Sequence, residues 1–283
     1  MLSSSRLYLA LSCVALAISG GARAQSLAPG ARYVSMGSSF AAGPGVTESA
    51  DTPPNACGRS VDNYAHQLAR KRKLLLVDMG CNGATTRNVL EGQNGLPPQV
   101  DALTPDTKLV TITIGGNDVS YMGAMIGSSC RNLAGADAAA AQKCNVSFVA
   151  SEAQWRGAEQ GMDHIVAEVR RRSPSARLVF VDYLTAFPAR GLCAGLPLSP
   201  ADAERLRAVA GRLAEMTARV AHRNKVELIR ASSLSRSHNV CSPVPWSVGY
   251  VPLPRGTFGP VPYHPNLAGM TAIAGALDRL LGR

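Results

Sequence analysis

The 283-residue chain has few aromatic and few charged side chains, with only two tryptophans. Its two dense basic runs are Arg70-Lys71-Arg72-Lys73 and Arg170-Arg171-Arg172, and no aromatic residue interleaves with them to stack on bases. Both runs fall where expected helices end, a position at which the helix dipole favours cations. We therefore expect no nucleic-acid partner, while the formal net charge of +10 leaves transient contact with anionic surfaces open.

The sequence also lacks an apolar run long enough to span a bilayer. The apolar stretch from Leu7 to Ile18 is too short for that purpose, follows Arg6 and precedes the small-x-small site Ala22-Arg23-Ala24. This pattern predicts a secretory signal peptide over residues 1–24 and an exported mature chain, extracellular or periplasmic, beginning near Gln25. Lipid attachment at Cys13 is the competing interpretation, but Cys13 lies in the middle of the apolar run.

No Cys-x-x-Cys pair is present, which argues against a metal or redox motif. Cleavage of the signal would remove Cys13 and leave six cysteines, an even number that indicates three disulfides in an exported chain. Fifteen pairings are open, of which nearest-neighbour pairing is the simplest: Cys57 with Cys81, Cys130 with Cys144 and Cys193 with Cys241. We expect no metal and no organic cofactor.

Strand-like and helix-like segments alternate along the mature chain. The expected strands cover residues 33–36, 74–77, 108–114, 177–181 and 226–229, and the one at 74–77 is expected to be buried. The expected helices cover 62–73, capped by Asp62, 148–172, 265–281, with Leu267 facing inward, and a segment that begins at Ser199. Alternation of this kind is typical of a parallel α/β sheet covered on both faces. The length suits one domain over residues 25–283, which we expect to be a monomer.

Four polar positions would meet at the carboxyl ends of these strands, the edge where such sheets gather functional groups. Ser39 follows the first strand, Gly83 and Asn117 lie in later turns, and His264 precedes the closing helix. Acyl transfer needs this set of groups: a hydroxyl nucleophile, a base, and donors for the oxygen that becomes negative. The amides of Ser39 and Gly83 and the side chain of Asn117 are the candidate donors.

His264 is the candidate base because the expected helix starts at the next residue, and its dipole would keep the imidazole neutral. His66, His164 and His222 lie within helical patterns, and His238 lies in a loop with no helix after it. A capping or surface role is the alternative for any single histidine.

The order of these motifs resembles that of the SGNH, or GDSL, hydrolase superfamily, especially its secreted six-cysteine esterases and lipases. Gly37-Ser38-Ser39-Phe40 stands where Gly-Asp-Ser-Leu is usual, followed by Gly83, Gly115-Gly116-Asn117-Asp118 and His264 in block order. The resemblance implies a three-layer α/β/α flavodoxin-like fold, Ser39 as nucleophile, His264 as base, and Ser39, Gly83 and Asn117 as the oxyanion hole. It also supports the nearest-neighbour disulfides.

Two positions depart from the family pattern. Ser38 replaces the usual Asp before the nucleophile, and Val261 stands where the third triad residue, an Asp, is typical. Because valine cannot accept from the imidazole, we predict a Ser-His dyad in which a backbone carbonyl, most simply that of Val261, orients His264.

The expected activity is hydrolysis of carboxylic esters, as an esterase or lipase. A non-catalytic exported binding protein and a polysaccharide deacetylase are the alternatives. Tyr121, Met122, Met125 and Ile126 could line an acyl pocket or simply pack a helix, and Asn145-Val146-Ser147 matches a glycosylation sequon.

Overall fold

The computed structural model describes residues 27–144, 149–251 and 259–282. Within them, five strands form one parallel sheet in the order β2-β1-β3-β4-β5. The strands are β1 (Arg32–Gly37), β2 (Leu75–Asp78), β3 (Thr107–Thr113), β4 (Arg177–Val181) and β5 (Glu227–Ile229). The strand order is that of the flavodoxin-like fold. The expected signal peptide and the glycosylation sequon lie outside the described residues.

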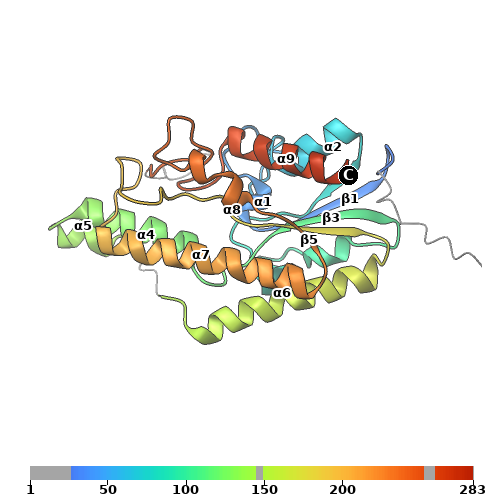
Figure 1. Ribbon diagram of the computed structural model, residues 1–283, viewed down its shortest axis with the longest axis horizontal. Helices are drawn as coiled ribbons and strands as arrows, with labels where there is room; N and C mark the ends of the chain where they lie inside the picture. The colour runs from blue at the N-terminus through green and yellow to red at the C-terminus, as the bar shows by residue number, and fades with distance from the viewer. Residues whose placement is uncertain (1–26, 145–148, 252–258, 283) are drawn as a thin grey trace, which may run out of the picture.

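Helices cover both faces of the sheet and make a three-layer α/β/α structure (Figure 1). On one face lie α2 (Tyr64–Arg72) and α9 (Leu267–Leu281); on the other lie α6 (Glu152–Arg172) and α7 (Pro200–Arg223). The remaining α-helices are α1 (Ser39–Ala42), α3 (Thr86–Glu91), α4 (Tyr121–Ala134), α5 (Ala138–Gln142) and α8 (Ala231–Leu234). None of the helices in the described ranges is long and apolar enough to cross a bilayer.

Side chains that alternate along the central strands supply two cores, one on each face. Val34 and Met36 of β1 pack with α6 and α7, while Tyr33 packs with α2 and α9. In β3 the same alternation sends Ile112 to the first core and Leu109 to the second. The sheet is thus fixed from both sides, and its carboxyl edge is a rigid base for the turns that follow.

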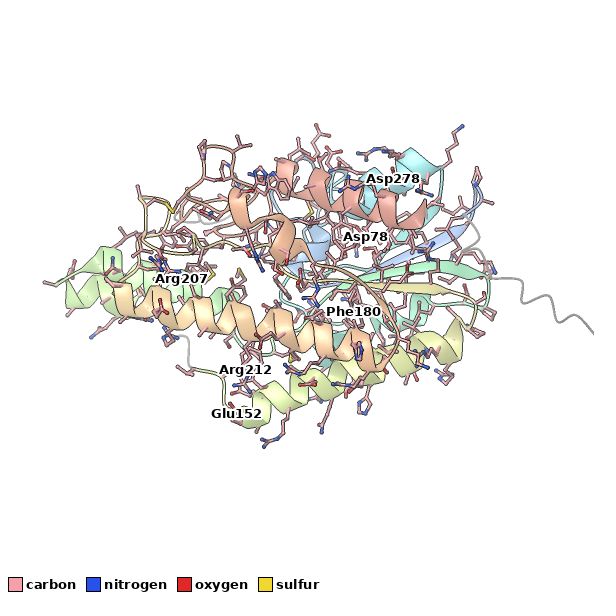
Figure 2. The ribbon with its side chains drawn as sticks, in the orientation of Figure 1. Asp78, Glu152, Phe180, Arg207, Arg212 and Asp278 are labelled. Carbon is pink, nitrogen blue, oxygen red and sulfur yellow. A yellow bond between two sulfur atoms is a disulfide. The ribbon has the colours of Figure 1, made fainter. Side chains whose placement is uncertain are left out.

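The three predicted disulfides are present: Cys57–Cys81, Cys130–Cys144 and Cys193–Cys241. The basic runs also lie at helix ends, as expected, because Arg70, Lys71 and Arg72 form the last turn of α2 and Arg170, Arg171 and Arg172 that of α6. Most of these cations are paired with carboxylates, for example Arg72 with Asp278 on α9. An ion pair also joins α6 to α7, where the Arg212 guanidinium donates to both carboxylate oxygens of Glu152 (Figure 2).

Four details of the sequence reading are wrong. Asn63, not Asp62, caps α2, because its side chain accepts from two amides of the first turn. The strand predicted as buried, β2, is an edge strand whose Leu75 is 63% exposed. The closing helix begins at Leu267 rather than Pro265, with Asn266 as its cap, and Leu267 faces outward instead of inward.

Candidate active site

Ser39 and His264 are in direct hydrogen-bonding contact although 225 residues separate them. Ser39 follows β1 and begins the four-residue helix α1, and His264 lies two residues before the Asn266 cap of α9. The Ser39 hydroxyl lies 2.8 Å from Nε2 of His264. Both residues are almost completely buried, at 3% and 4% exposure. The geometry is that of a hydroxyl and the base that can take its proton.

The position of Ser39 depends on the glycine two residues before it. Gly37 has φ +126°, and a Cβ there would lie 2.3 Å from the carbonyl oxygen of Thr113 on the neighbouring strand. The side chain of Gln99 holds both backbone groups of Gly37, accepting from its amide at 2.7 Å and donating to its carbonyl at 3.0 Å. The strand therefore ends at a fixed point, and the next turn presents Ser39.

A backbone carbonyl orients the His264 ring, as predicted, but it belongs to Pro262 and not to Val261. Nδ1 of His264 lies 2.8 Å from the Pro262 oxygen, whereas the Val261 oxygen accepts the His264 backbone amide at 3.2 Å. The Val261 carbonyl is already used in closing the turn, so the next carbonyl is the one that faces the ring. Because a carbonyl only accepts, Nδ1 carries the proton and Nε2 is left free to accept from Ser39.

Burial keeps the His264 imidazole neutral. It lowers the pKa of His264 to about 4, and the hydrogen bond to the Pro262 carbonyl opposes this effect only in part. The Phe40 ring, whose centroid is 5.0 Å from that of the imidazole, contributes to the apolar surroundings. Desolvation is thus the main cause of the neutral ring, and the contribution expected from the dipole of α9 stays a prediction.

Two of the three predicted oxyanion donors are backbone amides, those of Ser39 and Gly83. In the described part of the chain, no group accepts the amide proton of Ser39 or Gly83. Gly83 has φ +78° and nothing within 4 Å of where a Cβ would stand, so this turn leaves open space beside its backbone. The third donor, the Asn117 side chain, is held by donating one proton to the Ala84 carbonyl at 2.9 Å, and its second amide proton is left for a ligand.

The residue after Asn117 joins the two turns that carry these donors. Asp118 accepts from the Thr86 amide at 3.0 and 3.1 Å and from the Thr86 hydroxyl at 2.5 Å. Burial raises the pKa of this carboxyl, and the Thr86 hydrogen bonds counteract the rise. In the sequence, Asp118 is marked only as the last residue of the Gly115–Asp118 motif. Its contact with Thr86 cannot be found without the fold.

Tyr183 is the hydrogen-bond partner of Ser38, the residue that stands where an Asp is usual before the nucleophile. Its phenol lies 3.2 Å from the Ser38 hydroxyl and accepts the Gly116 amide at 2.9 Å. The Tyr183 ring also packs on Phe40, with centroids 4.6 Å apart. A Cβ on Gly116 would lie 2.7 Å from the Tyr183 ring, so a glycine is needed there. Sequence reasoning missed Tyr183 because nothing local marks the end of β4 as a neighbour of Ser38.

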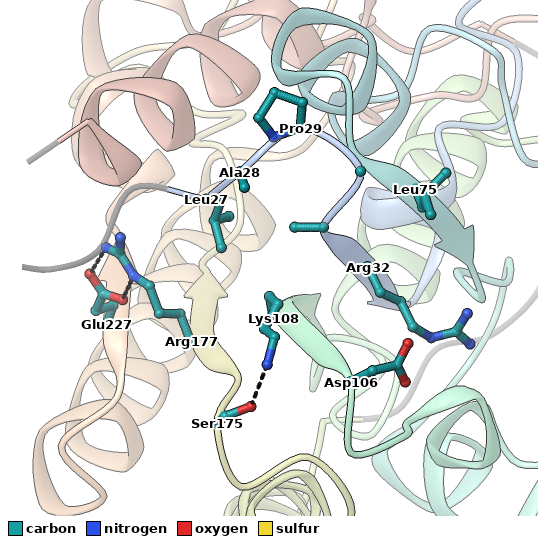
Figure 3. A pocket seen from close by; sticks show the side chains of 12 residues that line it. Leu27, Ala28, Pro29, Arg32, Leu75, Asp106, Lys108, Ser175, Arg177 and Glu227 are labelled. Atoms are coloured by element: carbon teal, nitrogen blue, oxygen red, sulfur yellow. Dashed lines mark hydrogen bonds and ion pairs between the residues drawn. The ribbon is translucent and has the colours of Figure 1, made fainter.

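A large hollow among the described residues lies at the other end of the sheet (Figure 3). It has a volume of about 850 Å³ and is lined by the amino ends of the strands, including Arg32, Lys108 and Arg177. Lys108 bonds to Ser175, and Arg177 forms an ion pair with Glu227. This hollow is separated from Ser39 by the length of β1 and has no part in the dyad.

The competing residues named from the sequence lie elsewhere or have structural roles. His66 is 3.5 Å from Asp78, and His238 stacks on Trp246 with ring centroids 4.0 Å apart. Of the suggested acyl-pocket residues, Tyr121, Met122 and Met125 belong to the main core, and Ile126 packs against it. Ordinary helix packing is therefore the better reading of that stripe. No group of three or more potential metal ligands occurs among the residues described.

Comparison with known proteins identifies the family of this chain. Residues 35–272 match the model of the GDSL-like lipase/acylhydrolase family. Lipase 2 of Streptomyces coelicolor is 32% identical over 267 residues, covering 88% of this chain and 85% of that protein.

Among solved structures, the extracellular lipase of Streptomyces rimosus is 25% identical with a TM-score of 0.69, over 88% of this chain and 98% of that one. Phospholipase A1 of Streptomyces albidoflavus has a TM-score of 0.71 at 23% identity, again over 88% of this chain and 99% of the other, which is a likeness of fold. The match over most of the chain, with Ser39 and His264 together at the carboxyl edge of the sheet, shows that this protein belongs to the GDSL-like lipase/acylhydrolase family.

Proposed function

We propose that the protein is an exported serine hydrolase that cleaves carboxylic esters through an acyl-enzyme, with Ser39 as nucleophile and His264 as base. The observation that carries the proposal is the chain of contacts from Ser39 through the imidazole to the Pro262 carbonyl. Similarity to lipases of Streptomyces coelicolor and Streptomyces rimosus supports the same chemistry.

In the first half-reaction the Ser39 oxygen attacks the ester carbonyl, and Nε2 of His264 accepts the hydroxyl proton. The imidazolium then gives this proton to the departing alcohol oxygen, and Ser39 is left acylated. Water takes the place of the alcohol in the second half-reaction, attacks the acyl carbon and loses a proton to Nε2. The imidazolium returns this proton to the Ser39 oxygen as the bond between that oxygen and the acyl carbon breaks, and the carboxylic acid leaves. The Pro262 carbonyl accepts from Nδ1 throughout and favours the charged ring while it exists.

The tetrahedral oxygen would be bound by the Ser39 and Gly83 amides and the Asn117 side chain. Each oxyanion donor is worth ~3 kcal/mol in related chemistry, so this set can account for much of the catalysis without a carboxylate behind the histidine. In this reading His264 needs only one fixed acceptor to hold its tautomer, and the Pro262 carbonyl serves.

Export and domain organisation belong to the same proposal. We place a cleaved signal peptide at residues 1–24 and a single catalytic domain over 25–283. The three disulfides support an oxidising destination outside the cytoplasm. The working unit is proposed to be a monomer that needs no cofactor, meets small-molecule or lipid esters and binds no nucleic acid.

The test is hydrolysis of a nitrophenyl acyl ester by purified wild type, Ser39→Ala and Ser175→Ala. Ser175 is an exposed serine at the opposite end of the sheet and serves as a matched control. We expect Ser39→Ala to remove turnover with secretion and folding intact, and Ser175→Ala to behave as wild type. Undiminished turnover by Ser39→Ala would reject the nucleophile, and an inactive wild type would favour the alternative of a non-catalytic binding protein.

A further inference from the structure

The residue before His264 has a backbone conformation that its side chain does not favour. Tyr263 has φ +64°, in the left-handed region that bulky residues rarely adopt. The His264 amide donates to the Val261 carbonyl, so residues 261–264 close a four-residue turn with Pro262 and Tyr263 at its centre. Proline at the first central position and a positive φ at the second define a type II turn, in which the second position is normally glycine.

This turn type determines where the Pro262 carbonyl points. Types I and II differ by a flip of the peptide between their two central residues, here the peptide whose oxygen belongs to Pro262. With a negative φ at Tyr263, that oxygen would face away from the side on which it now meets His264. The left-handed backbone of Tyr263 is therefore what presents the carbonyl to Nδ1 at 2.8 Å.

The Tyr263 side chain supplies the contact that holds the unfavourable conformation in place. Its phenol lies 2.5 Å from the Ser129 hydroxyl, and both residues are completely buried. Burial raises the pKa of Tyr263 to about 12, so the phenol stays protonated and available for this hydrogen bond. The Tyr263 amide also donates to the Val248 carbonyl at 2.9 Å. Strained residues persist where their surroundings fix them in this way, and they concentrate at functional sites.

Ser129 connects the turn to the part of the fold that carries an oxyanion donor. It lies in α4, whose first residue, Tyr121, donates its amide to the Gly116 carbonyl next to Asn117. The turn that carries His264 and the turn that carries Asn117 are thus both held by hydrogen bonds to residues of α4. Cys130, adjacent to Ser129, is fixed by its disulfide to Cys144.

We propose that Tyr263 is a positioning residue for the dyad: its left-handed backbone aims the Pro262 carbonyl at His264, and its phenol, anchored on Ser129, keeps that turn from relaxing. The inference rests on the proposed function in assigning His264 as the base. It predicts that Ser129 influences which ring nitrogen of His264 carries the proton, although Ser129 and His264 do not share a hydrogen bond.

The variants that test it are Tyr263→Phe, Ser129→Ala and the double variant, with Tyr250→Phe as control. Tyr250 lies beside Tyr263, with ring centroids 6.0 Å apart, and its phenol has no hydrogen-bond partner among the described residues. Tyr263→Gly is added because glycine adopts the left-handed position of the turn without strain and so keeps the direction of the Pro262 carbonyl without the phenol. Nitrogen NMR of histidine-labelled protein reports which ring nitrogen of His264 carries the proton, and ester hydrolysis reports kcat and KM.

We expect the Nδ1–H tautomer of His264 to dominate in wild type, Tyr250→Phe and Tyr263→Gly, and to lose population in Tyr263→Phe and Ser129→Ala. In the latter two variants kcat falls at least five-fold with KM within two-fold, and the double variant is no worse than the poorer single one. An unchanged tautomer, or a kcat within two-fold of wild type, in both Tyr263→Phe and Ser129→Ala would overturn the proposal, as would loss of the tautomer in Tyr263→Gly. An inactive wild type would refute the proposed function instead, and the tautomer measurement would still decide the role of Tyr263.

Discussion

Asp118 receives three hydrogen bonds from Thr86 and thereby joins the turn of Asn117 to the turn of Gly83. The contact spans 32 residues of sequence and lies directly behind two of the proposed oxyanion donors. The position of one donor turn relative to the other consequently depends on a half-buried carboxylate.

Replacement of this carboxylate is expected to reduce both stability and activity. In Asp118→Asn one acceptor oxygen becomes an amide group that cannot accept from Thr86, which costs about 1–3 kcal/mol of unfolding free energy. We expect a fall in kcat larger than any rise in KM, since the donors act in the transition state. Urea unfolding and ester hydrolysis measure the two effects. Asp106→Asn is the control, because Asp106 is an exposed carboxylate that accepts from Thr104 far from the site; equal behaviour of the two variants would contradict the assignment.

The pH profile should reveal the low pKa of His264. A base must be deprotonated, and a pKa lowered to about 4 leaves the ring neutral at every pH above that value. We expect kcat/KM for a nitrophenyl ester to be level from about pH 8 down to about pH 5 and to fall only as the pH approaches 4. A midpoint near 6.5, the ordinary histidine value, would mean that the imidazole is solvated in the working enzyme.

The same shift has a consequence for stability with a defined sign. Between about pH 6.5 and pH 4 the unfolded chain binds a proton at His264 that the folded chain does not, so this residue makes stability fall as the pH falls. His264→Ala should therefore show a shallower loss of unfolding free energy across that window than wild type. Parallel stability curves for the two proteins would show that burial does not depress this pKa.

The Cys57–Cys81 disulfide should matter for the site as well as for stability. Its loop spans 24 residues and ends two residues before Gly83, and the Asn82 amide donates to the Cys57 carbonyl. Replacing both cysteines by serine is expected to cost about 2–4 kcal/mol of stability on the chain-entropy model. It should also lower kcat at a temperature where the protein remains folded.

The matching control replaces Cys193 and Cys241, which close a loop of 48 residues away from the dyad. That variant should lose a similar free energy of unfolding and keep its kcat within two-fold. If both double variants lose stability but neither loses kcat, the Gly83 turn does not need its disulfide.

Much of this architecture could be predicted from local patterns. The β-branched run at Leu109–Ile114 is typical of a central strand, and Ser199-Pro200 marks a helix start that the structure has at the same residues. The motif order then places Ser39, Gly83, Asn117 and His264 at one edge of the sheet, because every strand of a parallel sheet ends there.

The features that could not be predicted depend on contacts distant in sequence or on backbone direction. Tyr183 meets Ser38 across 145 residues, and Gln99 meets Gly37 across 62, with no periodicity or spacing to mark either pair. The choice between the Val261 and Pro262 carbonyls depends on a left-handed residue at position 263, and a tyrosine in the sequence does not indicate that conformation. The main cause of the neutral His264 ring could not be predicted either, because burial is known only once the fold is assembled.

Covalent labelling of Ser39 by an organophosphonate tests the dyad most directly, because it needs an activated serine and no knowledge of the natural ester. The labelling rate is measured by mass spectrometry for wild type, His264→Ala and His238→Ala, the last being a histidine that stacks on Trp246 instead of reaching the serine. We predict modification confined to the peptide with Ser39, at equal rates in wild type and His238→Ala and at least 100-fold more slowly in His264→Ala. Labelling of another serine, or an undiminished rate in His264→Ala, would contradict the account.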